Sequence, residues 1–119
     1  MKKINNITFE DFKDKVFDVV GDKIEHKSDK PILVKFHADW WGPCKMFGQV
    51  LEEVYDEYED KVTFYEVDIE KERELANMFQ VRALPTSLFI SSKSKPEIRP
   101  GGMNKEQLKY YLEGLISKN

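Results

Sequence analysis

Residues 32–46 read ILVKFHADWWGPCKM and carry the most informative local pattern in the chain. The run from Ile32 to His37 is almost continuously apolar, which is typical of a strand covered on both faces. Pro43 suits the first turn of a helix, and apolar residues then recur at helical spacing as far as Tyr58. The stretch therefore predicts a buried strand that turns directly into a long helix. Free N–H groups and the positive end of a helix dipole meet at such a turn, where Cys44 stands.

Outward from this stretch, helical and extended patterns alternate along the chain. Thr8 can cap a helix whose apolar residues recur at three and four from Phe9 to Val19, and the polar segment 21–30 predicts a loop. Further strands are expected over 62–69, 86–90 and 97–99, further helices over 70–79 and after an Asn104 cap, and the pattern leaves open a short first strand over 3–6. Pro96 and Pro100 mark the strand over 97–99 as an edge strand. This order predicts an α/β domain over residues 1–119, with a mixed sheet and helices on both faces.

Composition and charge exclude several classes of function. With a net charge of −3, the chain has no basic footprint for nucleic acid, and no apolar stretch approaches the roughly 20 residues of a membrane span. One cysteine, Cys44, excludes an intrachain disulfide, and Cys44 with His26 and His37 makes no zinc-ligand set. The opening residues contain no apolar signal-peptide core. We therefore expect a cytoplasmic protein that needs no metal and no cofactor, and that is a monomer or a weak dimer.

Three motifs resemble those of the thioredoxin family. Residues 40–45 (WWGPCK) match the family signature Trp-Cys-Gly-Pro-Cys-Lys, residues 81–86 (VRALPT) are similar to its cis-proline loop, and Gly101 is similar to its last-turn glycine. The resemblance covers essentially the whole chain. It implies the thioredoxin fold, with a central mixed sheet of four to five strands flanked by about four helices.

One departure from the family pattern concerns the chemistry. Trp41 occupies the position of the attacking cysteine, and Cys44 occupies that of the resolving cysteine. In the family mechanism the first thiolate forms a mixed disulfide with a client, and the second cysteine resolves it. A complete dithiol cycle is therefore not expected from this chain alone. Cys44 is either a packed, inert residue or a residual thiol that forms mixed disulfides and waits for an external thiol.

A second departure lies in the strands below the motif. Where family members have a buried Asp and a nearby Lys, this chain has Lys35 and Glu66. A buried ammonium needs a counterion within about 4 Å, and Glu66 is the natural candidate. The alternative is that Lys35 extends its charge to the edge of a cleft. For His37 we expect a packed, hydrogen-bonded side chain, the alternative being a role in tuning Cys44.

The resemblance also implies a surface for client peptides. The residues that match it are Trp40, Gly42, Pro43, Leu84, Pro85 and Gly101, and Trp41 adjoins them. Trp41 either adds an aromatic anchor to this surface or folds down over the former active site.

These features predict a thioredoxin-like protein of thiol/disulfide homeostasis. It would bind client or partner proteins and at most form mixed disulfides through Cys44. One alternative is a purely non-catalytic binding or chaperone-like module. A weaker alternative is a reductase that borrows a thiol from its partner.

Overall fold

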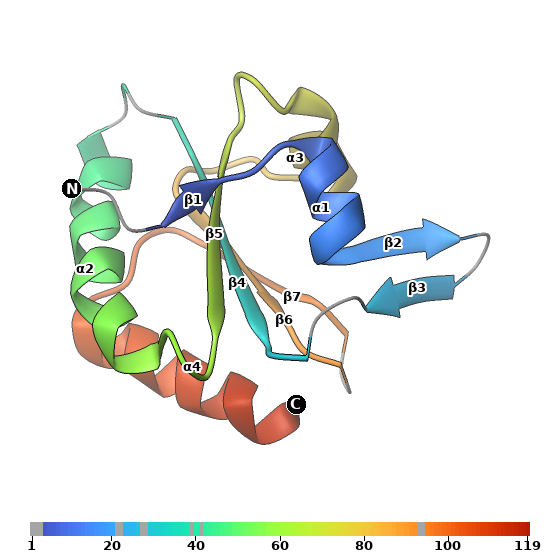
Figure 1. Ribbon diagram of the computed structural model, residues 1–119. Coiled ribbons are helices and arrows are strands. Elements are labelled where there is room, and N and C mark those ends of the chain that lie inside the picture. Colours follow the sequence, from blue (N-terminus) through green and yellow to red (C-terminus); the bar gives the residue numbers. More distant parts are fainter. Residues whose placement is uncertain (1–3, 21–22, 27–28, 39, 41, 93–94) are drawn as a thin grey trace.

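A mixed sheet of five strands forms the centre of the molecule, in the order β1-β5-β4-β6-β7 (Figure 1). The computed structural model describes residues 4–20, 23–26, 29–38, 40, 42–92 and 95–119, and for 17–20, 23–26 and 43 it describes the backbone alone. In chain order the elements are β1 (Asn5–Asn6), α1 (Phe9–Lys15), β2 (Phe17–Val20), β3 (Lys23–His26), β4 (Ile32–His37), α2 (Gly42–Tyr58), β5 (Thr63–Asp68), α3 (Arg73–Met78), β6 (Thr86–Ile90), β7 (Glu97–Pro100) and α4 (Lys105–Lys118).

Helices cover both faces of this sheet. Strands β1, β5 and β4 are parallel, whereas β6 and β7 run antiparallel to their neighbours. One apolar cluster joins the sheet to α2 and α4, and a second joins it to α1 and α3 (Figure 1). The predicted α/β fold is confirmed: the main sheet has five strands, within the expected four to five, and the described residues form four α-helices.

Strand β4 is buried along its whole length, as its apolar sequence predicts. Successive side chains of a strand point to opposite faces. Leu33 accordingly belongs to the cluster under α2 and α4, and Val34 to the cluster under α1 and α3. Lys35 shares the face of Leu33, so this charged side chain points toward α2.

The sheet ends at β7, and prolines protect that edge. The Gly101 N–H donates to the Pro85 carbonyl at 2.7 Å, which fixes the alternation of the antiparallel ladder between β6 and β7. Ile98 and Pro100 therefore lie at non-hydrogen-bonded positions, where the backbone N–H and C=O groups point away from β6 toward the free edge. Pro100 has no N–H to present there. The predicted edge strand is confirmed, and it offers little to a further strand.

The segment from Val16 to His26 differs from the prediction. The helix predicted to reach Val19 ends at Lys15, and the predicted loop contains a strand, so that β2 and β3 form an antiparallel pair apart from the main sheet (Figure 1). Phe and Val at 17, 19 and 20 favour extended structure, and the Gly-Asp pair at 21–22 is a common hairpin link. These local preferences outweigh the weak helical spacing of 16 and 19.

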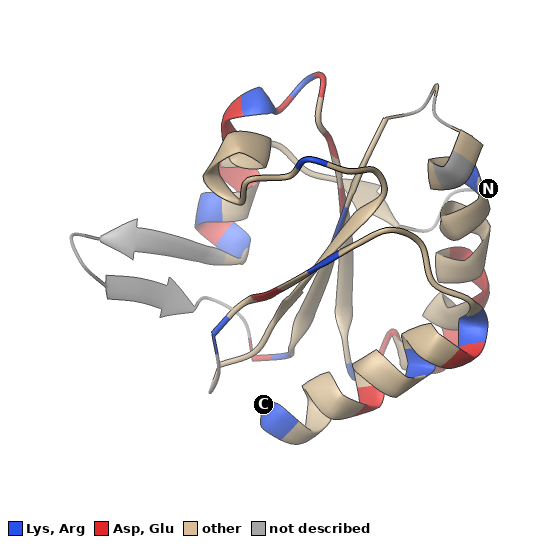
Figure 2. Cartoon of the chain, turned by 180° about the vertical axis from the view of Figure 1, so that it is seen from behind, with Lys and Arg blue, Asp and Glu red and all other residues tan. Residues whose placement is uncertain are grey.

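Charged residues of both signs alternate along α4 (Figure 2). No helix among the described residues is long and apolar enough to cross a lipid bilayer.

Candidate functional site

The turn from β4 into α2 carries the motif residues. Cys44 lies in the first turn of α2, is unpaired with another cysteine, and is 2 % exposed. Trp40 precedes the helix and is 66 % exposed. Its indole N–H donates to the carboxylate of Glu70, whose own backbone N–H donates to Asp68 Oδ1 at 2.9 Å. The turn after β5 thus holds the exposed ring of Trp40.

Two predicted site residues are not fully described. Trp41 lies outside the described residues, so the choice between an aromatic anchor and a plug stays open. Gly42 is exposed at the start of α2, and of Pro43 only the backbone is described.

The loop before β6 lies against the end of β7. The Leu84–Pro85 peptide bond is cis, as the resemblance led us to expect, and Gly101 has a φ of 88°, a conformation that favours glycine. The hydrogen bond from the Gly101 N–H to the Pro85 carbonyl joins these two motifs. A Cβ built on Gly102 would lie 3.7 Å from Phe47 Cβ and 3.9 Å from Pro85 Cγ, so the two loops pack beside α2.

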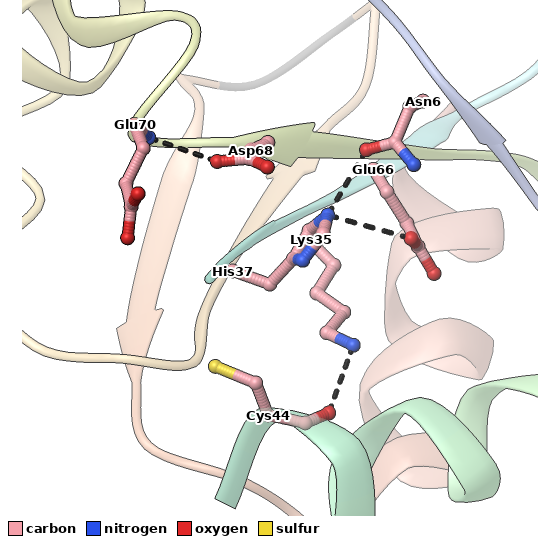
Figure 3. Close-up of polar contacts among 7 residues, drawn as sticks. All are labelled: Asn6, Lys35, His37, Cys44, Glu66, Asp68 and Glu70. Atoms are coloured by element: carbon pink, nitrogen blue, oxygen red, sulfur yellow. Dashed lines mark hydrogen bonds and ion pairs between the residues drawn. The ribbon is translucent and has the colours of Figure 1, made fainter. Parts of the chain in front are cut away.

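Beneath the motif a group of polar side chains is buried (Figure 3). Lys35 is 4 % exposed, and its ammonium donates to the Cys44 backbone carbonyl at 3.0 Å. Glu66 is 1 % exposed and stands opposite Lys35 in the parallel register of β4 and β5. The structure therefore brings Lys35, Glu66 and Cys44 together, while an ion pair between Lys35 and Glu66 stays a prediction.

His37 is packed and hydrogen-bonded, as predicted. It is 3 % exposed, and its Nε2 lies 3.0 Å from Asn6 Oδ1 and 3.5 Å from Glu66 Oε2. Both neighbouring atoms are oxygen acceptors, so these contacts are favourable in the tautomer that has its proton on Nε2. The contact ties β1 to β4 beside the buried charges.

Sequence reasoning missed three residues of this site: Asn6, Gly48 and Glu70. Asn6 and Glu70 are polar residues near strand ends, where nothing in the local sequence marks a partner about 30 residues away. Gly48 lies inside the helix that the apolar spacing after Pro43 predicts, and a Cβ there would lie 3.0 Å from Lys35 Nζ. A glycine in the interior of a predicted helix was a signal that could have found it.

This arrangement supplies one sulfur and no second thiol. A single thiolate can exchange with a disulfide, but it cannot close an internal disulfide. Among the described residues no group of three or more His, Cys, Asp or Glu side chains could hold a metal ion.

Comparison with known proteins identifies the family. The thioredoxin family model matches residues 6–114. The thioredoxin of Borreliella burgdorferi is 38 % identical over 102 residues, which cover 85 % of this chain and 87 % of that one. The thioredoxin of Buchnera aphidicola is 33 % identical over 113 residues, covering 95 % and 96 %.

A solved structure shows the same fold. Chloroplastic thioredoxin z superposes with a TM-score of 0.79 at 22 % identity, covering 98 % of this chain and 97 % of that one. The sequence relatives carry the assignment beyond fold: the chain belongs to the thioredoxin family of thiol–disulfide redox proteins.

Proposed function

We propose that this protein binds client or partner polypeptides on its motif face and cannot complete a dithiol reductase cycle by itself. The observation that carries the proposal is that the chain has one cysteine, Cys44, at the second position of the motif. Trp41 stands where the attacking cysteine would be. The most that this site offers a client is one mixed disulfide.

Surface features support a binding role. Proteins of this family interact with protein clients. Trp40 is 66 % exposed and its ring is held by Glu70, so a large aromatic surface is fixed before a client arrives. Two adjoining loops contribute Leu84 and Gly101, which are half-buried, whereas Pro85 is itself buried. Gly42 is exposed, and the family resemblance implies that Trp41 and Pro43 complete the surface.

The chemistry of a mixed disulfide limits what Cys44 can do. Its thiolate would attack one sulfur of a client disulfide, the S–S bond would break, and the other client sulfur would leave as a thiolate. Releasing the reduced client then requires two electrons from two external thiols, which end as a disulfide. An external small thiol or a thiol of the partner must therefore complete any turnover, which is the form that a borrowed-thiol reductase would take.

A second candidate is a purely non-catalytic binding or chaperone-like module. The 2 % exposure of Cys44 favours it, because a covered thiol reacts slowly with any reagent. The two candidates differ in the labelling of Cys44 at neutral pH. Labelling at the rate of a small peptide thiol supports the redox function, whereas labelling that requires unfolding supports the binding module.

Insulin reduction by dithiothreitol tests the missing cycle. We expect the unmodified protein to leave the rate unchanged, and Trp41→Cys to accelerate it weakly, because Lys35 cannot accept a proton as the family's buried Asp does. The matched control is Tyr110→Cys, which places a second thiol on an exposed position of α4. Acceleration by the unmodified chain would refute the proposal.

Binding is tested separately with a peptide that has no free thiol. We expect Trp40→Ala to weaken the binding of carboxymethylated insulin B chain, measured by fluorescence anisotropy of the labelled peptide. Tyr110→Ala removes another exposed aromatic ring, 76 % exposed on α4, and should have no effect. Equal losses in both variants would argue against a binding surface at the motif.

We also propose that residues 1–119 form one domain, a monomer or weak dimer in the cytoplasm. Two apolar clusters share a single sheet, which supports one domain. A chain with one cysteine has no internal disulfide that would require an oxidising compartment.

A further inference from the structure

A cleft of about 810 Å³ lies between one side of α2 and strands β4 and β5. Its floor contains three buried polar side chains, those of Lys35, His37 and Glu66, which are 4 %, 3 % and 1 % exposed. Buried polar groups that converge on a cavity of this size are typical of small-molecule sites. The cleft reaches the motif, because Cys44 and Lys45 are among its lining residues. The described residues of the client surface proposed above, such as Trp40 and Leu84, are not among them.

Gly48 leaves room for the Lys35 ammonium at the floor of the cleft. It is the lining residue of α2 at which a Cβ would come within 3.0 Å of Lys35 Nζ. Because Gly48 has no side chain, the ammonium of Lys35 fits beneath the helix and donates to the Cys44 carbonyl (Figure 3). The floor is therefore a built polar surface rather than a gap between loosely packed side chains.

Opposite charges lie at the two ends of the cleft. Lys45 stands at the start of α2, where the helix dipole is also positive, and Glu52 and Glu53 stand seven and eight residues further on. At 1.5 Å per residue this separates the two ends by about 10–12 Å along the helix axis. Gln49 lies between them and offers an amide donor and acceptor to a ligand backbone.

We propose that this cleft binds a short zwitterionic peptide of about three residues. Three extended residues span about 10–11 Å, which matches the distance between the opposite charges. The peptide carboxylate lies at the Lys45 end, and its ammonium lies at Glu52 and Glu53. A ligand with a negative charge at each end would be repelled by the two glutamates, and a ligand with a positive charge at each end would be repelled by Lys45. The charges of the cleft therefore favour a zwitterion. Cys44 also lines the cleft, so the carboxylate end of the peptide would lie beside this thiol, but binding by charge requires no reaction there.

Titration with triglycine, followed by amide chemical shifts of the labelled protein, tests the proposal. We expect saturable shifts confined to the cleft. N-acetyl-triglycine and triglycine amide, which lack the ammonium and the carboxylate, should each bind about tenfold more weakly, as the loss of one charged hydrogen bond implies.

Variants separate the two ends of the site. Glu52→Gln with Glu53→Gln should abolish the preference for triglycine over its N-acetyl form, and Lys45→Gln should abolish the preference over its amide. The matched control, Glu59→Gln with Asp60→Asn, removes the same charge from exposed positions outside the cleft and should retain both preferences.

Three results would overturn the proposal: no saturable shift at millimolar triglycine, equal affinity for the capped peptides, or the same loss in the control variant. Client binding by the motif face is measured with a different probe, so its failure would leave this result unaffected.

Discussion

The position of Gly48 beneath the Lys35 ammonium leads to a prediction about stability. Gly48 lies inside α2, where alanine is the better helix former, and the mean effect of Gly→Ala in a helix is stabilising by about 0.5–1 kcal/mol. At Gly48, however, the new Cβ would lie 3.0 Å from Lys35 Nζ, tighter than an ordinary contact. The ammonium must move by a few tenths of an ångström, which lengthens and weakens its 3.0 Å hydrogen bond to the Cys44 carbonyl.

The two effects differ in size. A hydrogen bond from a charged donor contributes about 1.5–3 kcal/mol, more than the gain in helix propensity. Gly48→Ala should therefore destabilise the natural protein, by at most about 1–2 kcal/mol if the hydrogen bond is broken completely. Methionine at position 35 ends one atom short of Nζ and has a sulfur in place of Cδ, so in the background Lys35→Met with Glu66→Gln the contact is gone. There Gly48→Ala should stabilise the protein by about 0.5–1 kcal/mol.

Urea denaturation of the four proteins measures the two effects, because the change in free energy of unfolding can be compared between backgrounds. Gly114→Ala is the matched control, since Gly114 lies in α4 and a Cβ there meets nothing within 4 Å. It should stabilise both backgrounds. The reasoning fails if Gly48→Ala stabilises the natural protein as Gly114→Ala does, or has the same sign in both backgrounds.

Three further predictions concern other contacts. Burial and a 2.6 Å hydrogen bond to Glu113 raise the pKa of Tyr58 from 10.0 to about 12. Because the unfolded chain loses this proton first, the free energy of unfolding should fall as pH rises from 10 toward 12. Tyr58→Phe should flatten that fall in urea titrations, and an unchanged dependence on pH would contradict the assignment. If Lys35 and Glu66 interact, Lys35→Met alone should lower the free energy of unfolding by about 3–5 kcal/mol, because it removes the cation next to the buried Glu66 carboxylate. Adding Glu66→Gln should recover part of this loss. Strictly additive losses in the double-mutant cycle would show that the two charges do not interact. Asn104→Ala removes the cap of α4 and should lower the free energy of unfolding by about 1 kcal/mol, whereas Asn104→Ser should lower it by much less.

Much of the fold could be predicted from local sequence because local physics dictates it. The nearly continuous apolar run from Ile32 to His37 is typical of a buried strand, and β4 has these bounds. Asn104 caps α4 through its own side chain and Gln107, a pattern that needs no tertiary contact. The segment from Val16 to His26 could not be predicted in this way, because helical spacing and β-branched residues gave opposite indications there.

For the site, the residue types alone indicated which groups are present: one thiol at a helix start, two indoles before it, and a lysine in place of an acid below it. The spatial partners of these groups depended on how distant segments of the chain pack together. The Lys35 ammonium meets the Cys44 carbonyl nine residues away, and His37 meets Asn6 from another strand. Such partners are set by strand register and by the approach of α2 to the sheet, which depend on the packing of the whole core and leave no local pattern.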